Sequence, residues 1–418
     1  MQFSDGAHHP VVVVGGGQAG LATSRQLGWH GVDHLVLEAD RVGSEWRNRR
    51  WDSFCLVTPN WQCRLPGFPY DGPEPDGFMV RDEIVGYLED YRRTFDVPIV
   101  EGVRATRLDS GFRIATTAGT ITAGQVVVAT GPYQTPRIPR MAERLRVVQL
   151  HSSQYKNPDQ LPPGEVVVVG TGQSGCQIAE DLHLAGRTVH LATGSAPRVA
   201  RFYRGLDVVT WLDRMGYYRK GIDEFEDADA VRLRANHYVT GRDGGRDIDL
   251  RRFALEGMRL YGRLVDADPQ VLRFAGDLGR NLDHADAVSE GIKDAIDAYI
   301  DSERIDAPEE DRYQPVWQPD AEPEELSLQG IGAIVWSTGF RRDDGWIRVP
   351  VFDGQGRPSH RRGVTSVPGL YFVGLPWQHT WGSGRFAGVA DDAQYLAERI
   401  VEHRAGVHWI AGLHRTVA

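Results

Sequence analysis

The sequence predicts an α/β protein with two parallel sheets, because two apolar strands end in the same glycine-rich turn and each leads into a helical pattern. The first strand is the valine run 11–14 and the second is the valine run 166–169. Each is followed by the spacing G-x-G-x-x-G. Short β-branched runs of this kind are typical of parallel strands buried on both faces. A strand, a tight turn and a helix in this order indicate a Rossmann-like unit.

The glycines of each turn have separate tasks. In this motif the first allows the tight bend, the second lets the backbone approach a pyrophosphate, and the third lets the helix pack closely on the strand. The helix N-terminus then faces the phosphates. One match alone is weak, but two in a strand–turn–helix context indicate two bound dinucleotides. The predicted contacts are Gly15, Gly17, Gln18, Ala19 and Gly20 in the first turn, and Gly170, Gly172, Gln173, Ser174 and Gly175 in the second.

An acidic residue distinguishes the first unit from the second. Glu38 ends the strand 35–37, about 20 positions past the first turn, where a carboxylate accepts both ribose hydroxyls of an adenosine. A 2′-phosphate would be repelled there, so the first turn is expected to hold FAD or NAD rather than NADP. An ordinary exposed charge at the strand end is the other interpretation of Glu38.

The second unit has no acid at the matching place. Its second strand ends at Ala192 and is followed by Thr193, Gly194 and Ser195, then by Arg198, Arg201 and Arg204. A guanidinium matches a phosphate bidentately, so this unit is predicted to bind NADPH. Arg198 is the expected 2′-phosphate contact, aided by Thr193 or Ser195. The alternative is a solvated basic loop.

Composition limits the classes of function. The chain has 418 residues, enough for two domains, and a formal net charge of −10, which argues against a nucleic-acid or anionic-membrane surface. Its three cysteines form no CxxC, so neither a zinc site nor a dithiol pair is indicated and no metal is expected. The N-terminus lacks the pattern of a signal peptide, and no apolar run approaches the ~18 residues of a membrane span. A cytoplasmic location is expected.

Periodicity and punctuation then divide the chain. Helices are predicted at 18–29, 82–95, 174–185 and 386–403, strands at 35–37, 188–192 and 331–339, and a hairpin-rich segment at 99–128. Two amphipathic stretches, 250–265 and 285–300, suggest a helical insertion at about 206–325. The expected layout is an FAD domain (1–160) completed by 331–418, with an NADPH domain (161–330) inserted in it.

Further motifs resemble those of the class B flavin monooxygenases, which include flavin-containing monooxygenases, plant auxin-forming enzymes, N-hydroxylases and Baeyer–Villiger enzymes. The segment 43–47 is similar to one that lies along the flavin in that family. The segment 129–139 resembles its A-T-G-x-x-x-x-P-x-x-P linker, and His151 with Tyr155 match part of its fingerprint. The resemblance implies cofactor contacts at Ser44, Trp46, Arg47, Thr130, Gly131, Thr338, Gly339 and Gly374.

The fingerprint is incomplete, because Leu145 and Val147 stand where the family has Phe and Gly. This leaves subgroup and substrate open. The segments 251–254 and 381–386 are similar to a bacterial branch of the superfamily.

The resemblance implies an FAD monooxygenase that uses NADPH and O₂ to oxygenate a small organic substrate at nitrogen or sulfur through a C4a-peroxyflavin. Asn60 and Gln62 are candidate donors to the flavin edge or the peroxide, with a turn role as the alternative for Asn60. His151 is a candidate general base, but a linker role between the domains is preferred for it, with a plain structural histidine as the alternative. The rival functions are a flavin-dependent NAD(P)H oxidase or reductase and a non-catalytic nucleotide sensor. A homodimer is a further expectation.

Overall fold

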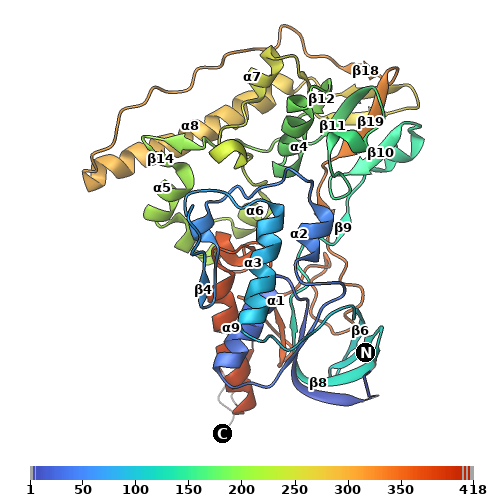
Figure 1. Cartoon of the computed structure of the whole chain (residues 1–418), viewed down its shortest axis with the longest axis vertical. Coiled ribbons are helices and arrows are strands. Elements are labelled where there is room, and N and C mark those ends of the chain that lie inside the picture. The colour runs from blue at the N-terminus through green and yellow to red at the C-terminus, as the bar shows by residue number, and fades with distance from the viewer. Residues whose placement is uncertain (1–2, 5, 407–408, 411–412, 415–418) are drawn as a thin grey trace.

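The computed structural model describes residues 3–4, 6–406, 409–410 and 413–414. Figure 1 shows two lobes, one above the other. The lower lobe contains helices α1 (Gln18–Trp29), α3 (Arg81–Thr94) and α9 (Val389–Arg404), and the upper lobe contains α4 (Gln173–Leu184) and the long helix α8 (Leu278–Glu303). Each lobe is built on its own sheet.

The sheet of the lower lobe combines strands from both ends of the chain. Its order is β21-β22-β23-β8-β1-β2-β5, and β6 and β7 extend it next to β8. The strands β23, β8, β1, β2 and β5 are parallel. Their bounds are β1 (Ala7–Val14), β2 (Leu35–Leu37), β5 (Ile99–Val100), β6 (Ala105–Asp109), β7 (Arg113–Thr116), β8 (Gly119–Val128), β21 (His360–Arg361), β22 (Val364–Thr365) and β23 (Leu370–Phe372).

The sheet of the upper lobe is parallel, in the order β10-β19-β11-β12-β15. Its strands are β10 (Val148–His151), β11 (Glu165–Val169), β12 (Val189–Ala192), β15 (Arg259–Tyr261) and β19 (Ile331–Trp336). Two of these strands, β10 and β19, lie outside the range 161–330 that was expected for the second domain. They belong to this sheet because they pair with each other and β19 also pairs with β11. The domain boundaries themselves stay a prediction.

Both valine runs alternate between two hydrophobic cores. Val11 and Val13 belong to one buried cluster, and Val12 and Val14 belong to another on the opposite face of the sheet. The run 166–169 alternates in the same way. Side chains of a strand point alternately to its two faces, so an unbroken valine run needs apolar layers on both sides. Each glycine turn follows directly after its strand and therefore lies at the carboxyl edge of its sheet.

Local patterns located most helices closely. Helix α1 has the expected bounds, and α3 and α4 begin and end one residue before the expected ones. The stretch 250–265 is not one helix, in contrast to the expectation. It forms α7 (Leu250–Leu255), after which Gly257 adopts φ +104 and the chain continues into β15. A left-handed glycine ends a helix, and neighbouring β12 then recruits the following residues as an edge strand.

The remaining elements are the helices and the small sheet of the insertion and a number of short helices and strands. Helices of the insertion are α5 (Val208–Arg214), α6 (Ala228–Leu233), α7 and α8, and a small antiparallel sheet is formed by β16 (Leu264–Ala267), β17 (Val271–Phe274) and β18 (Glu325–Ser327). The short elements are α2 (Ser44–Arg49), β3 (Arg64–Leu65), β4 (Phe68–Pro69), β9 (Thr135–Pro136), β13 (Phe202–Tyr203), β14 (Leu206–Asp207), β20 (Phe340–Arg341), β24 (Trp409–Ile410) and β25 (Leu413–His414).

Candidate active site

The first glycine turn has the geometry of a phosphate-binding turn. Gly15 has φ +114, and a Cβ there would lie 2.4 Å from the carbonyl oxygen of Ala129. A Cβ at Gly20 would lie 1.8 Å from the carbonyl oxygen of Gly15, so only glycine lets α1 pack on this turn. A Cβ at Gly17, in contrast, would meet no atom within 4 Å. The open space at Gly17 lies at the N-terminus of α1, where an anion is stabilised.

The second turn repeats this geometry. Gly170 has φ +104, and a Cβ there would lie 2.8 Å from the carbonyl oxygen of Ser337. A Cβ at Gly175 would lie 1.8 Å from the carbonyl oxygen of Gly170, while Gly172 faces open space. Ser174 lies in the first turn of α4. The two turns therefore offer equivalent cradles to two pyrophosphates.

Glu38 is held in place beside the first turn. Its Oε2 accepts a hydrogen bond from the backbone N–H of Gly16 at 2.7 Å, and its Oε1 accepts one from the N–H of Asp40 at 2.9 Å. Burial raises the pKa of this carboxyl above its ordinary value. A carboxylate anchored by two backbone donors is preorganised to accept further hydrogen bonds, as a ribose requires.

One cavity of about 1320 Å³ extends from the first glycine turn to Gln173 of the second, whereas Gly170, Gly172, Ser174 and Gly175 do not line it. The N-terminal residues of α1 line it, and Gln173 and Gln177 of α4 line the same space. Of the expected cofactor contacts, those in this lining are Gly15, Gly17, Gln18, Ala19, Glu38, Ser44, Trp46, Thr130, Gly131, Gln173 and Gly374. The structure thus brings residues from both lobes to one site.

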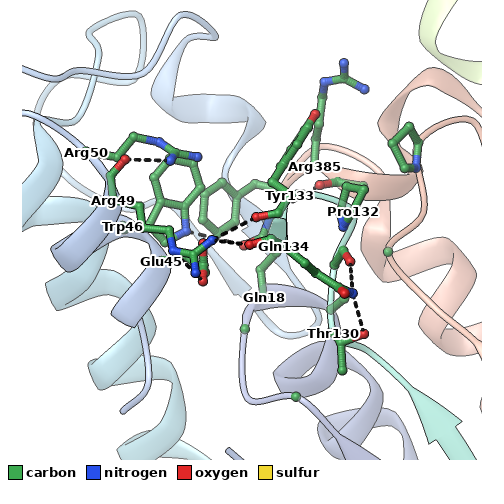
Figure 2. A pocket seen from close by; sticks show the side chains of 18 of the residues that line it. Gln18, Glu45, Trp46, Arg49, Arg50, Thr130, Pro132, Tyr133, Gln134 and Arg385 are labelled. Atoms are coloured by element: carbon green, nitrogen blue, oxygen red, sulfur yellow. Dashed lines mark hydrogen bonds and ion pairs between the residues drawn. The ribbon is translucent and has the colours of Figure 1, made fainter. Parts of the chain in front are cut away.

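Figure 2 shows how one wall of this cavity is braced. Trp46 stacks on Phe386 with ring centroids 5.8 Å apart, and its Nε1–H donates to Oε1 of Gln18 at 3.4 Å. Gln134 donates through Nε2 to Oγ1 of Thr130 at 3.1 Å and to the carbonyl oxygen of Gly131 at 2.9 Å. These contacts fix the positions of the segments that follow β1 and β8 at the wall of the cavity.

Several cavity residues were not expected from the sequence. Arg50 lies over the ring of Trp46 at 5.1 Å, and burial lowers the pKa of its guanidinium. Gln134, Tyr133, Arg50 and Arg385 all line the cavity. Tyr133 and Gln134 occupy unspecified positions of the segment 129–139, and neither the segment 381–386 nor the residues after α2 indicated a role for Arg385 or Arg50. The only available signal was their proximity in sequence to the A-T-G turn, to the flavin-lining segment and to the strand that ends at Gly374.

The expected catalytic amides are buried beside the site and do not line this cavity. Both amide atoms of Asn60 brace a turn: Nδ2 donates to the carbonyl oxygen of Glu74 at 3.0 Å, and Oδ1 accepts from the N–H of Met79 at 2.6 Å. Gln62 is also buried, but neither its Nε2 nor its Oε1 has a hydrogen-bond partner among the described residues. These contacts match the turn role of Asn60, and the catalytic role of either amide stays a prediction.

His151 joins two segments of the upper lobe. The N–H of Ser153 donates to its Nδ1 at 3.2 Å, so the ring proton lies on Nε2, which donates to the carbonyl oxygen of Gly339 at 2.9 Å. Burial lowers the pKa of the ring, which favours the neutral form. Thr338 donates through Oγ1 to the carbonyl oxygen of Arg137. These contacts fit the linker interpretation of His151, and its catalytic role likewise stays a prediction.

The basic residues after β12 are engaged with carboxylates. Arg198 is buried, donates through Nε to Asp286 at 2.6 Å and lies over the ring of Tyr313 at 3.9 Å. Oγ1 of Thr193 donates to the carbonyl oxygen of Tyr261 at 2.8 Å. A 2′-phosphate at Arg198 would therefore have to share or replace an existing ion pair, and this assignment stays a prediction. Arg47 likewise pairs with Glu89 at 2.6 Å.

A buried carboxylate ties the lobes together. Asp181 of α4 accepts hydrogen bonds from the hydroxyl groups of Ser53 at 2.6 Å and Tyr155 at 2.7 Å, and from Arg242 at 2.9 Å. Ser53 follows α2, Tyr155 follows β10, and Arg242 belongs to the insertion. Sequence reasoning identified Tyr155 but not its partner, because Asp181 occupies an ordinary helical position.

Comparison with known proteins shows the family to which the chain belongs. Residues 12–241 match the family described as pyridine nucleotide-disulphide oxidoreductase. A CzcO-like uncharacterized oxidoreductase of Geobacillus kaustophilus is 33% identical over 401 residues, covering 94% of this chain and 98% of that protein. The chain belongs to this oxidoreductase family. Part of its sequence and its fold are also similar to those of flavin-dependent monooxygenases.

Two further similarities cover less of the chain or have a lower sequence identity. The indole-3-pyruvate monooxygenase YUCCA4 of Oryza sativa is 35% identical over 194 residues, covering 41% of this chain and 44% of that protein. A flavin-containing monooxygenase from Stenotrophomonas maltophilia has a similar structure, with a TM-score of 0.66, 20% identity and coverage of 95% and 99% of the two chains. At this identity the structural likeness concerns the fold.

The residues present at the two glycine turns fit two bound dinucleotides, FAD and NADPH. Gly17 and Gly172 leave open space at two helix N-termini, and Glu38 is preorganised for a ribose. Oε1 of Gln177, which lines the cavity, is buried without a hydrogen-bond partner among the described residues. Within the same part of the chain, no group of three or more His, Cys, Asp or Glu side chains is arranged to hold a metal ion. No described helix is long and apolar enough to cross a membrane.

Proposed function

We propose that this protein is an NADPH- and O₂-dependent FAD monooxygenase that oxygenates a small organic substrate at nitrogen or sulfur. The observation that carries this proposal is a cavity that is lined both by the first glycine turn and by Gln173 and Gln177 beside the second. A dinucleotide at each turn would extend into the same space, where a hydride donor and a flavin must meet. Bound FAD, reduced by NADPH, supplies the oxygen-transferring chemistry.

The chain's own residues position the cofactors and exclude water. Trp46, Phe54 and Phe386 form an apolar cluster on the cavity wall, with Trp46 and Phe54 centroids 5.8 Å apart. Such a cluster shields reactive groups from bulk water. Gln18 and Trp46 connect the first turn to the flavin-lining segment, which fixes the orientation of both. The nucleophilic substrate supplies the electron pair, so no acid–base pair from the protein is required.

NADPH rather than NADH is proposed because Thr193 stands where an NAD-binding unit carries an acid. The first turn is assigned to FAD for the converse reason, since Glu38 would repel a 2′-phosphate. A homodimer and a cytoplasmic location also stay predictions.

The main rival is a flavin-dependent NAD(P)H oxidase or disulfide reductase on the same scaffold. A dithiol reductase needs an accessible thiolate. Cys55, Cys63 and Cys176 are buried, and burial raises the pKa of Cys55 to about 11 and that of Cys63 to about 12. These thiols are poor nucleophiles, which favours oxygen chemistry over dithiol chemistry.

Incorporation of labelled oxygen tests the proposal. Purified FAD-containing protein is supplied with NADPH and ¹⁸O₂, and a panel of amines and thioethers is screened for product by mass spectrometry while hydrogen peroxide is measured in parallel. One labelled oxygen atom per product, with peroxide falling as substrate is added, is the expected result. Stoichiometric peroxide with every compound would establish the oxidase. A protein that holds no flavin would favour the nucleotide sensor.

A further inference from the structure

Arg385 places a guanidinium group in the cavity with only neutral partners. It follows the turn 381–384 and lies over the ring of Trp381, 3.9 Å from its centroid. Its Nη2 donates to Oδ1 of Asn236 at 2.7 Å, and its Nη1 donates to the carbonyl oxygen of Trp381. In Figure 2 Arg385 lies across the cavity from Trp46, Arg49 and Arg50. Arg385 therefore faces the space shared by both lobes.

Two fully buried guanidinium groups are paired with carboxylates, whereas Arg50, which lines the same cavity, donates to the carbonyl oxygen of Arg49 and lies over the ring of Trp46. Arg201 lies 3.0 Å from Asp207, and Arg251 lies 2.8 Å from Asp286. No carboxylate of the described residues lies within 4.0 Å of the Arg385 guanidinium. Burial lowers the pKa of Arg385, because its charge is taken out of water without a counter-ion. An anionic ligand would offset this cost.

Two tyrosines complete a binding site for an anion. Tyr217 and Tyr218 belong to the short helix 217–219 of the insertion and line the same cavity. The ring of Tyr218 lies 4.5 Å from that of Trp381, which places it next to Arg385. Neither hydroxyl has a hydrogen-bond partner within the described part of the chain. A carboxylate can accept from a guanidinium and from hydroxyl groups at once.

Aliphatic side chains form part of the cavity lining on this side, next to the polar residues Arg234, Asn236 and His237. Val208, Val209 and Leu212 of α5 line the cavity, together with Val288 and Ile292 of α8. These residues belong to the insertion, so they are supplied by the upper lobe and do not belong to either glycine turn. A cation with hydroxyl donors beside an aliphatic wall suits a ligand with one carboxylate and an apolar body.

We propose that the substrate is an organic monocarboxylate with an apolar body, and that its carboxylate is bound by Arg385 with the hydroxyl groups of Tyr217 and Tyr218. This inference rests on the proposed monooxygenase function and names its substrate class. The other anion that enters the cavity is a phosphate of NADPH, so the test separates a carboxylate from a phosphate.

Calorimetric titration of the oxidised, FAD-containing protein tests the site without turnover. The probes are phenylacetate, phenylpropanoate and phenylbutanoate, each with its neutral amide, and NADP⁺. At least one acid is expected to bind wild-type protein more tightly than its amide. Arg385→Gln is expected to raise the Kd of that acid at least tenfold and leave the Kd of the amide and of NADP⁺ within about twofold, in line with the loss of a charge-assisted hydrogen bond.

Three controls support this comparison. Arg385→Lys keeps the charge and is expected to retain part of the preference for the acid. Arg25→Gln removes a guanidinium that stacks on Trp29 at 4.2 Å, away from the cavity, and is expected to change no Kd. If Arg385→Gln does not fold, the double variant Tyr217→Phe with Tyr218→Phe decides, with an expected rise of several-fold in the Kd of the acid.

Other outcomes would overturn the inference. They are acids that bind no better than amides, an equal rise in the Kd of NADP⁺, and loss of FAD from a folded Arg385→Gln protein, which would assign the guanidinium to a cofactor. Failure of the proposed monooxygenase function can be distinguished from failure of this binding site. In that case acids would still bind through Arg385, but no labelled oxygen would enter any product.

Discussion

The contrast between Gly17 and Gly20 gives the sharpest prediction, because the same methyl group added at the two positions meets opposite surroundings. At Gly20 the new Cβ would lie 1.8 Å from the backbone oxygen of Gly15. Restoring a 3.0 Å contact would require the helix to move by about 1.2 Å. Gly20→Ala is therefore expected to destabilise the protein by about 1–3 kcal/mol or more, with or without flavin.

At Gly17 the methyl group meets no protein atom within 4 Å, and the backbone (φ −76, ψ −176) is allowed for any residue. The free energy of unfolding of the apoprotein is expected to change by less than about 1 kcal/mol, because a weaker N-cap and a more restricted unfolded chain offset each other. The methyl group instead occupies the space of the pyrophosphate. Loss of one charge-assisted hydrogen bond of ~1.5–3 kcal/mol would weaken FAD binding tenfold to a hundredfold.

The assay combines urea unfolding of the apoproteins with fluorescence titration of FAD. Gly17→Ala should unfold like the wild type and bind FAD poorly, whereas Gly20→Ala should fail in both measurements. Gly172→Ala and Gly175→Ala provide the matched pair for NADPH, because their surroundings are the same. Full FAD affinity in Gly17→Ala, or normal stability in Gly20→Ala, would refute the assignment of these roles.

Three further predictions concern buried polar groups. Asp181→Ala should lower the free energy of unfolding by about 1–3 kcal/mol in urea titrations, because it leaves the buried Tyr155 hydroxyl unpaired and removes a partner of the half-buried Arg242; a loss below about 0.5 kcal/mol would contradict this role. Burial lowers the pKa of His237 to about 4, so the stability it contributes is present above its unfolded pKa of 6.5 and is lost as pH falls from 6.5 toward 4. His237→Phe should remove up to about 3 kcal/mol of this acid sensitivity, and unchanged stability curves against pH would exclude the assignment. If Arg198 binds the 2′-phosphate, Arg198→Ala should raise the KM of NADPH tenfold to a hundredfold and change the KM of NADH little. Equal changes in the two KM values, together with a lower melting temperature, would show that Arg198 serves only the ion pair with Asp286.

The agreement between sequence and structure is closest where local rules decide the conformation. The valine runs predict strands because every residue of a doubly buried strand must be apolar. The glycine spacing predicts both turns because a positive φ and a helix packed against a carbonyl each exclude a Cβ. These constraints act within about ten residues, so the bounds of α1 and the strand 35–37 were predictable.

Elements that depend on distant partners were predicted less well. The stretch 250–265 has a helical period, yet its second part forms β15 because the edge of β12 offers backbone hydrogen bonds. The strands β10 and β19 join the upper sheet for the same reason. Backbone pairing between segments more than 150 residues apart leaves no trace in local periodicity.

The candidate site shows the same division. By itself, the sequence determined that two dinucleotide turns exist and that Glu38 distinguishes the first, because each depends on residue type at a fixed short spacing. Only the tertiary structure decided that one cavity extends from the first turn to Gln173 of the second and that Arg198 is paired with Asp286. It also decided that Arg385 faces this cavity with no carboxylate of the described residues beside it. Charge pairing depends on distances in space, and segments brought together by two sheets and an insertion set those distances.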